Sequence, residues 1–347
     1  MRVEIESLRA RLRAPFVSAS GAISERGVLL VRVEDADGHV GVGEAAPLPD
    51  YHGVNVEDVL EALEACRDML AAASPGASTA AALAEWRRLA VTPAVAAIDM
   101  ALWDLESRQS GQPVWQRLGA RAANPVEVNY TIAAADRAGA ASEAAVARAG
   151  GFRCVKVKVG IGDDAGRLAA VRAVIGPGAA IRLDANGAWS VQEAVAALRA
   201  LAPTGIELCE EPVHGLAQTR EVAAAVPEVP VALDETASAS GALDERVCRA
   251  VCLKVAACGG ITGLIDSSRR ARAAGYEVYL ASTLDGPLGI AAALHAAAAI
   301  APDRPCGLAT LGLFAGRADP LPARAGRMAV PPGNGLGEGL LAWYGAA

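Results

Sequence analysis

The sequence predicts an α/β protein in which a (β/α)8-type barrel follows an α+β region and precedes a shorter tail. Beyond residue 124, apolar strand-like segments alternate with Ala-rich amphipathic segments, and the strand-like segments begin roughly 20 to 29 residues apart. The residues before this point lack that period. Because 347 residues suffice for one large domain and a smaller one, we expect the divisions 1–123, 124–310 and 311–347.

The first third is expected to combine antiparallel strands with helices. Residues 1–45 are expected to be mostly strand, and Asp35-Ala-Asp-Gly38 has the composition of a tight turn between two of the strands. Pro and Gly in 46–53 predict a loop, after which Asn55 caps a helix that segment 74–78 ends. Individual strands and helices are expected at 28–34, 39–44, 56–73 and 93–107.

The barrel is expected to contain eight β/α units. Its strands are predicted at 126–132, 152–159, 180–184, 206–209, 229–233, 250–255, 277–282 and 306–308. Amphipathic segments such as 191–202 and 217–225 supply the helices between them. Catalytic side chains in such barrels lie at the carboxyl ends of the strands, so chemistry is expected there. The tail, 311–347, has no barrel partner left and is expected to return to the N-terminal region.

The charge and the cysteine content argue against several other classes of protein. A net charge of -7, from 32 basic and 39 acidic residues without any Lys/Arg run, is unlike a nucleic-acid-binding surface. The apolar stretch 289–300 contains His295 and is too short to span a bilayer, and the N-terminus does not resemble a signal peptide. The seven cysteines form no C-x-x-C pair, which predicts a cytoplasmic protein without disulfides or zinc. Cys252, in an apolar run, is expected to pack as a small hydrophobic residue.

A pair of lysines is the first candidate for chemistry. Lys156 and Lys158 are two residues apart in an apolar strand-like run, so both side chains project from the same face. Two cations on a buried face are costly unless something there requires them. Crowding of like charges and desolvation both lower the pKa of a lysine, which makes it a usable base. By itself, the pattern also fits an edge strand with two solvated lysines.

Acidic residues end the three strands that follow, and Lys254 ends the next. The acids are Asp184, the pair Glu210 and Glu211, and the pair Asp234 and Glu235. Carboxylates that converge at one barrel mouth repel each other unless a cation lies between them. Oxygen ligands select a hard cation, and a site with open coordination positions suits Mg²⁺. One acid at a strand end is more often a helix N-cap or a surface residue, but the ordered set favours a metal site.

Such a site suits the removal of a proton next to a carboxylate. That proton is too weakly acidic for a lysine alone, and a metal bound to the carboxylate stabilises the charge that builds up. Lysines on opposite sides would then face the two sides of the α-carbon. Loss of a leaving group, ring closure and reprotonation on either face all stay open.

Five short motifs resemble the muconate-lactonising subgroup of the enolase superfamily, over nearly the whole chain. They are Lys156-x-Lys158, Asp184-Ala-Asn186, Glu210-Glu-Pro212, Asp234-Glu-Thr236 and Lys254. The resemblance implies that Asp184, Glu210 and Asp234 bind Mg²⁺, or Mn²⁺ in its place. It implies that Lys158 and Lys254 are the acid/base pair flanking the α-carbon. Lys156 would stabilise the carboxylate charge and lower the pKa of Lys158.

The resemblance also implies that the first third and the tail form a capping domain over the barrel mouth. The loops at 18–21 and 47–53 would close on the substrate. Further contacts to the substrate or to the metal ligands are expected from Asn186, Glu211, Glu235, Ser282, Asp285 and Tyr51. For Tyr51, a flexible surface loop is the alternative interpretation.

Two stretches bear on the reaction. Residues 281–290 resemble the seventh-strand segment of the subgroup in general, and 306–314 resemble the eighth-strand stretch of one branch of o-succinylbenzoate synthases. Dipeptide epimerases carry an Asp-x-Asp pair there for the substrate ammonium, whereas no acid lies between Cys306 and Phe314. The resemblance therefore implies a Mg²⁺-dependent carbon–oxygen lyase, an o-succinylbenzoate synthase of menaquinone biosynthesis.

The expected partner is a small anionic substrate, because the metal, the lysines and two arginines near the cap, Arg13 and Arg26, all favour negative charge. An N-acylamino acid racemase, a dipeptide epimerase and a muconate-type cycloisomerase are the alternatives within the fold. A non-catalytic metal-binding barrel is the alternative outside enzymology, although a binding module would not need lysines on both sides. Neither nucleic acid nor membrane is expected as a partner, and assembly into a homo-oligomer stays open.

Overall fold

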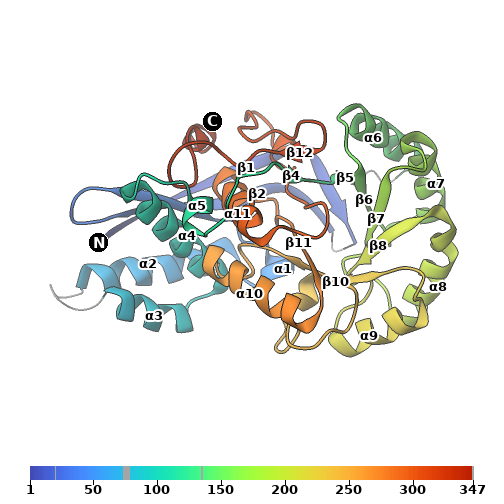
Figure 1. Ribbon diagram of the computed structural model, residues 1–347, viewed down its shortest axis with the longest axis horizontal. Coiled ribbons are helices and arrows are strands. Elements are labelled where there is room, and N and C mark those ends of the chain that lie inside the picture. The colour runs from blue at the N-terminus through green and yellow to red at the C-terminus, as the bar shows by residue number, and fades with distance from the viewer. Residues whose placement is uncertain (20, 73–78, 134–135, 346–347) are drawn as a thin grey trace.

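The computed structural model describes residues 1–19, 21–72, 79–133 and 136–345, and it has the expected α/β architecture (Figure 1). A three-stranded antiparallel sheet lies in the N-terminal capping domain, and a seven-stranded parallel sheet forms the barrel. A two-stranded ribbon joins the tail to the start of the barrel. The barrel helices lie outside the parallel sheet, so the strands turn their inner side chains toward one another (Figure 1).

In the capping domain, one helix packs closely on the antiparallel sheet. Its elements are β1 (Arg2–Ser18), β2 (Gly21–Glu34), β3 (Val40–Ala45), α2 (Val56–Ala72), α3 (Thr79–Leu89) and α4 (Thr92–Gln109). The predicted turn after β2 is present, since the Asp35 carboxylate accepts hydrogen bonds from the N–H groups of Asp37 and His39 at 2.8 and 2.9 Å. Helix α4 packs directly on β3, because a Cβ at Gly41 or Gly43 would lie 2.1 Å from a backbone oxygen of α4.

The segment 46–53 is not a loop throughout, because it contains the single-turn helix α1 (Pro49–His52). Proline is favoured at the first position of a helix, and Gly53, with a φ of 69°, takes the left-handed conformation that ends it. The next helix is capped as predicted, since the N–H of Asp58 donates to Asn55 Oδ1 at 2.8 Å. The predicted break at 74–78 lies outside the described residues.

The barrel sheet has the order β11-β10-β9-β8-β7-β6-β5. Its strands are β5 (Tyr130–Ile132), β6 (Cys154–Lys158), β7 (Ala180–Asp184), β8 (Ile206–Glu210), β9 (Val231–Leu233), β10 (Ala250–Leu253) and β11 (Glu277–Leu280). Its helices are α6 (Arg137–Ala149), α7 (Asp164–Ile175), α8 (Val191–Leu201), α9 (Leu216–Ala225), α10 (Ile261–Ala274) and α11 (Pro287–Ile300), and α5 (Val114–Arg117) precedes them. The parallel register places Lys158 beside Asp184 and Asp184 beside Glu210.

The predicted first and eighth barrel strands differ from the structure. The segment 126–132 is divided into β4 (Val126–Glu127), which pairs with the tail strand β12 (Arg327–Met328), and β5. The segment 306–308 forms only isolated bridges, from Cys306 to Val128 and from Gly307 to Ala281. These bridges join the two edges of the seven-stranded sheet, so the ring closes without a regular eighth strand.

The tail, residues 311–347, contacts both domains. A 3-10 turn spans Leu311–Leu313, and a second spans Leu340–Trp343. Phe314 forms a bridge to Leu12 of β1, and Gly335 forms one to Pro113. No helix in the described ranges combines the length and the apolar character needed to cross a membrane.

A buried ionic cluster joins the capping domain, the barrel and the tail. Glu44 of β3 accepts a hydrogen bond from the Tyr344 hydroxyl, which in turn accepts one from the N–H of Leu288 at 2.9 Å. Arg26 and Asp285 are also buried there. Burial, together with the charge of Asp285, raises the pKa of Glu44 to about 8. The folded protein therefore holds a proton on Glu44 that the unfolded chain releases at lower pH.

We expect the stability of the protein to fall between about pH 5 and about pH 8, because the raised pKa of Glu44 stabilises the fold only while that carboxyl is protonated. Glu44→Gln mimics the protonated acid, so its melting temperature should depend less on pH across this window. Thermal unfolding at several pH values measures the difference. Glu64→Gln, an exposed change on α2, is the control, and equal slopes for wild type and Glu44→Gln would contradict the expectation.

Candidate active site

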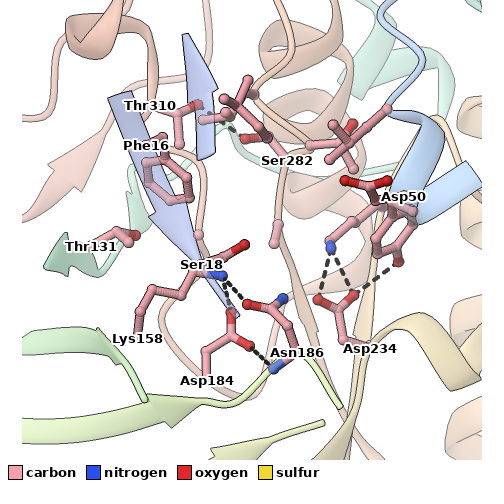
Figure 2. Close-up of a pocket in the computed structure, with 18 of the residues that line it drawn as sticks. Phe16, Ser18, Asp50, Thr131, Lys158, Asp184, Asn186, Asp234, Ser282 and Thr310 are labelled. Atoms are coloured by element: carbon pink, nitrogen blue, oxygen red, sulfur yellow. Dashed lines mark hydrogen bonds and ion pairs between the residues drawn. The ribbon is translucent and has the colours of Figure 1, made fainter. Parts of the chain in front are cut away.

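A pocket at the carboxyl ends of the barrel strands is lined by residues of both domains (Figure 2). The barrel contributes Thr131, Lys156, Lys158, Asp184, Asn186, Asp234, Glu235, Lys254, Ala281, Ser282, Thr283, Leu284, Gly307 and Thr310. The capping domain contributes Phe16, Ser18, Gly21, Ile23, Leu48, Asp50 and Tyr51. The expected loops at 18–21 and 47–53 thus face the pocket through their described residues, while residue 20 lies outside them.

The three lysines alternate with the acids at the base of this pocket. Lys156 Nζ lies 2.7 Å from Asp184 Oδ2 and 2.5 Å from Glu210 Oε1. Lys158 Nζ lies 2.6 Å from the same Asp184 oxygen. Lys254 Nζ lies 2.7 Å from Asp234. All of these side chains are buried, so each charge depends on its neighbours for stabilisation.

Neighbouring carboxylates raise the pKa of two of the buried lysines, Lys156 and Lys254. Burial alone would lower the pKa of Lys156, but Asp184 and Glu210 outweigh it and raise that pKa above its ordinary value. Burial and Asp234 act in the same opposed way on Lys254, whose pKa is also raised. The expectation that crowding of like charges and desolvation lower the lysine pKa is therefore wrong for Lys156.

Lys156, Lys158 and Lys254 are the only lysines in the whole sequence, in which the other basic residues are Arg and His. The pKa of a lysine ammonium can be shifted by its surroundings, so that it can take part in proton transfer, whereas a guanidinium stays charged. The sequence therefore carried a signal that motif spacing alone did not use, because every lysine of this chain lies in one pocket.

The oxygen atoms at the base of the pocket fit a hard divalent cation. Asp184, Glu210 and Asp234 are buried at or just beyond the ends of adjacent strands, and Lys156 bridges the first two. Ligand atoms of Glu210, Asp234 and Cys252 lie within 4.8 Å of one another, whereas Asp184 falls outside this group and is joined to Glu210 through Lys156. Carboxylates in this arrangement suit Mg²⁺, while burial raises the pKa of the Cys252 thiol and keeps it a poor ligand.

Three buried residues that do not line the pocket support its acids, and the sequence did not predict this role. Cys252 of β10 is buried as expected, two positions before Lys254, which follows that strand, and its sulfur lies near the carboxylates of Glu210 and Asp234. The Tyr279 hydroxyl donates to Glu210 Oε2 at 2.6 Å, and the Arg182 guanidinium lies 4.3 Å from the Tyr279 ring. The two-residue period before Lys254 and Asp184 could have identified Cys252 and Arg182, but the role of Tyr279 depends on packing.

Asn186, Glu211 and Glu235 lie beside the acids, each in a different role. Asn186 accepts from Lys158 Nζ at 2.8 Å and donates to Glu235 Oε1 at 3.0 Å. Glu211 does not line the pocket; its carboxylate accepts from the N–H groups of Asp234 and Thr236 at 2.7 and 3.0 Å. Glu211 thus orients the segment that carries Asp234. Asn186 and Glu211 both have a positive φ, 45° and 40°. This strained conformation turns the backbone sharply just after β7 and β8.

Aromatic residues of the capping domain cover the lysines. The Tyr51 hydroxyl donates to Asp234 Oδ1 at 2.9 Å, and the centroid of its ring lies 3.8 Å from Lys254 Nζ. The Phe16 ring lies 5.6 Å from Lys158 Nζ, and Figure 2 shows both side chains on the side of the pocket away from Asp234. Such rings attract a cation and keep water away from it.

Two expectations about the pocket wall need correction. Ser282 lines the pocket and shares a hydrogen bond of 3.0 Å with Thr310, but Asp285 does not line it and instead accepts from Thr283 Oγ1 at 2.8 Å. Arg13 and Arg26 do not line it either. Arg13 donates to the carbonyl of Gly312, and Arg26 to those of Ala46 and Pro47. The capping arginines therefore hold the backbone rather than an anionic substrate.

Replacing Lys156 with Met should destabilise the metal-free protein by about 3 kcal/mol, because Asp184 and Glu210 would face each other without the ammonium between them. Urea unfolding in the presence of a chelator measures this loss. Arg249→Met, which breaks an ion pair at the surface, is the control and should cost about 1 kcal/mol or less. A Lys156→Met protein as stable as wild type would show that this bridge is unimportant.

Comparison with known families accounts for both parts of the chain. Residues 2–119 match the mandelate racemase/muconate lactonizing enzyme N-terminal domain. Residues 139–341 match the enolase C-terminal domain-like family.

Relatives with several activities share this fold. The L-Ala-D/L-Glu epimerase of Bacillus subtilis is 32% identical over 314 residues, which cover 86% of this chain and 84% of the relative. Its solved substrate complex superposes with a TM-score of 0.88, covering 97% of this chain and 98% of that one, at 28% identity. A dipeptide epimerase of Cytophaga hutchinsonii, solved with Mg and D-Ala-L-Val, gives a TM-score of 0.87 at 25% identity and covers 98% and 97% of the two chains. The o-succinylbenzoate synthase of Mycobacterium bovis is 36% identical over 234 residues, covering 60% of this chain and 69% of the relative.

Proposed function

Because this chain belongs to the mandelate racemase/muconate lactonizing enzyme family of the enolase superfamily, we propose that it racemises or epimerises a small carboxylate substrate with the help of Mg²⁺. The placement of two lysines supports this most directly. Lys158 ends β6 and contacts Asp184, whereas Lys254 follows β10 and contacts Asp234. Three strands lie between β6 and β10 in the sheet, so the two ammonium groups approach the pocket from opposite sides.

Asp184, Glu210 and Asp234 would hold the metal. Mg²⁺ bound by them supplies positive charge that stabilises the negative charge growing on the substrate carboxylate as its α-proton leaves. Lys158 and Lys254 do the proton transfer, one removing the proton from one face of the α-carbon and the other returning a proton to the opposite face. Tyr51 keeps Lys254 in place through its contacts with that lysine and with Asp234.

One wall of the pocket is formed by residues that follow β11 and by the segment 306–314. This wall indicates which group is attached to the α-nitrogen of the substrate. Ser282, Thr310 and the backbone at Gly307 offer neutral hydrogen-bonding groups there, and the segment 306–314 has no acid. A free ammonium would be poorly stabilised against such a wall, whereas an acylated nitrogen is neutral and suits it. The proposed substrates are therefore N-acylated α-amino acids. The acyl group need not be an aminoacyl group, as it is in a dipeptide.

Metal removal should abolish turnover, and Mg²⁺ should restore it. Asp234→Asn should bind Mg²⁺ roughly 100-fold more weakly or worse, because a neutral amide replaces a charged ligand. Calorimetric titration of Mg²⁺ measures the affinity, and Asp266→Asn, an exposed change on α10, is the control. Full activity in excess chelator would rule out the proposed metal dependence.

Replacing Lys158 and replacing Lys254 should each abolish α-proton exchange for a different enantiomer of the substrate. Lys158→Ala should stop exchange of the α-proton with D2O for one enantiomer of the substrate, and Lys254→Ala for the other, each by about 100-fold or more. Proton NMR of each enantiomer, mixed separately with each variant and Mg²⁺, measures the exchange. If one variant loses exchange of both enantiomers while the other keeps both, a single base operates and two-sided proton transfer is wrong.

A dehydratase is the second candidate function, and one observation favours it. The segment 306–314, which resembles that of o-succinylbenzoate synthases, forms part of the pocket wall through Gly307 and Thr310. In that reaction Lys158 would remove the α-proton and return it to the hydroxyl group as the C–O bond breaks, so that water leaves, and Lys254 would remain a cation beside the substrate. The single-base outcome of the exchange experiment, together with loss of the diene absorbance of the synthase substrate, would favour this alternative.

A further inference from the structure

A second hollow adjoins Lys254, between the segments that follow β9 and β10. It is lined mainly by residues of the segments 237–244 and 252–258 and by Ser267 and Arg270 of α10, and its volume is about 380 Å³. Among the described residues, only Tyr51 and Lys254 line both this second hollow and the pocket shown in Figure 2. These two side chains therefore form the wall between the two spaces.

One end of the second hollow lies at the surface, and the other end is buried. Asp244 and Arg270, whose side chains are 59% and 54% exposed, form an ion pair of 2.7 Å at the outer end. Cys252 and Lys254 are only 1% and 6% exposed and lie at the inner end. The hollow thus leads from solvent to a buried ammonium group without passing through the pocket.

The lining of the second hollow suits water. Ser238, Ser240 and Ser267 contribute hydroxyl groups, and a space of this size with several polar partners holds water. Within the described chain, the Lys254 ammonium donates only to Asp234, at 2.7 Å to each carboxylate oxygen. One of its three N–H groups therefore has no oxygen acceptor in the described protein, and water in the hollow can accept that bond.

Lys158 is placed differently. It lines the pocket but not the second hollow, and its ammonium donates to Asp184 at 2.6 Å and to Asn186 at 2.8 Å. A ligand that fills the pocket would cover Lys158, whereas Lys254 would keep the second hollow on its other side.

We propose that the second hollow is the route by which the Lys254 ammonium exchanges protons with solvent while a ligand occupies the pocket. Each exchange replaces one ammonium proton with one proton from water, so the charge of the lysine does not change. The inference rests on the proposed function only in taking Lys254 as a proton-transfer group. During turnover, an α-proton taken up by Lys254 would be lost to water, whereas one taken up by Lys158 would remain at the site.

The test follows the ammonium groups directly, because a chain with three lysines gives only three such NMR signals when lysine is labelled with nitrogen-15. Lys158→Ala and Lys254→Ala assign the signals. Exchange of each ammonium with water is measured with Mg²⁺, before and after addition of N-acetyl-L-leucine, whose binding is checked by calorimetry. In wild type, the ligand should slow exchange of Lys158 about 10-fold or more and that of Lys254 less than about 2-fold.

Two variants place bulk in the second hollow from different elements, Ser267→Phe on α10 and Ala257→Leu after β10. Arg269→Phe is the control, because it adds the same ring on α10 at a side chain that is 74% exposed and outside the hollow. In both filled variants the ligand should slow exchange of Lys254 about 10-fold or more, while the control behaves like wild type. Melting temperatures show which variants fold, and either filled variant is sufficient for the test.

Equal slowing of Lys158 and Lys254 by the ligand in wild type overturns the proposal. Exchange of Lys254 in a folded, filled variant that matches wild type overturns it as well. Binding of the ligand without α-proton exchange would refute the racemase activity and leave the route intact. If the ligand does not bind, the proposed substrate class fails, and the route is tested without ligand. Filling the hollow should then still slow exchange of Lys254 and leave Lys158 unchanged, and an unchanged Lys254 rate overturns the proposal.

Discussion

Alternation of buried positive and negative charge at the carboxyl ends of β6 to β10 is the constraint on which the rest of this structure depends. Lys156, Lys158 and Lys254 are only 8%, 6% and 6% exposed, so none of them is stabilised mainly by water. Each lies against a carboxylate carried by a neighbouring or nearby strand, and removal of either partner would leave an uncompensated buried charge. A slip of one residue in strand register would turn the lysines away from the acids, and the register is therefore specified by charge as well as by packing.

The capping domain and the tail extend this constraint outward. Tyr51 and Phe16 cover the lysines from the capping domain, and Arg26 holds the backbone just before the helix that carries Tyr51. Arg26 belongs to the same buried cluster as Glu44, which receives the hydroxyl of Tyr344 from the far end of the chain. Residues separated by almost the whole sequence thus help to position helix α1, whose Tyr51 contacts the proposed metal ligand Asp234.

The two ends of the pocket have different chemistry. At the base, the positive charges of the lysines nearly balance the negative charges of the acids. All three lysines of the protein are gathered there. Toward the capping domain, the wall is largely apolar. This division matches the general behaviour of barrel enzymes, in which strand ends carry the reaction while loops over the mouth set the choice of substrate.

The sequence by itself determined the barrel, the lysine pair and the acids that end successive strands, because these depend on short-range periodicity and on the polarity of parallel strands. Lys156 and Lys158 share a face through the two-residue strand period, and Asp184 lies beside Lys158 because parallel strand ends coincide. Only the tertiary structure decided that residues 306–308 close the ring by isolated bridges, that Asp285 joins a buried cluster with Arg26 and Glu44 instead of lining the pocket, and that Tyr279 supports Glu210. Each of these outcomes depends on contacts between segments far apart in the chain, where local pattern carries no information about which partner a side chain will meet.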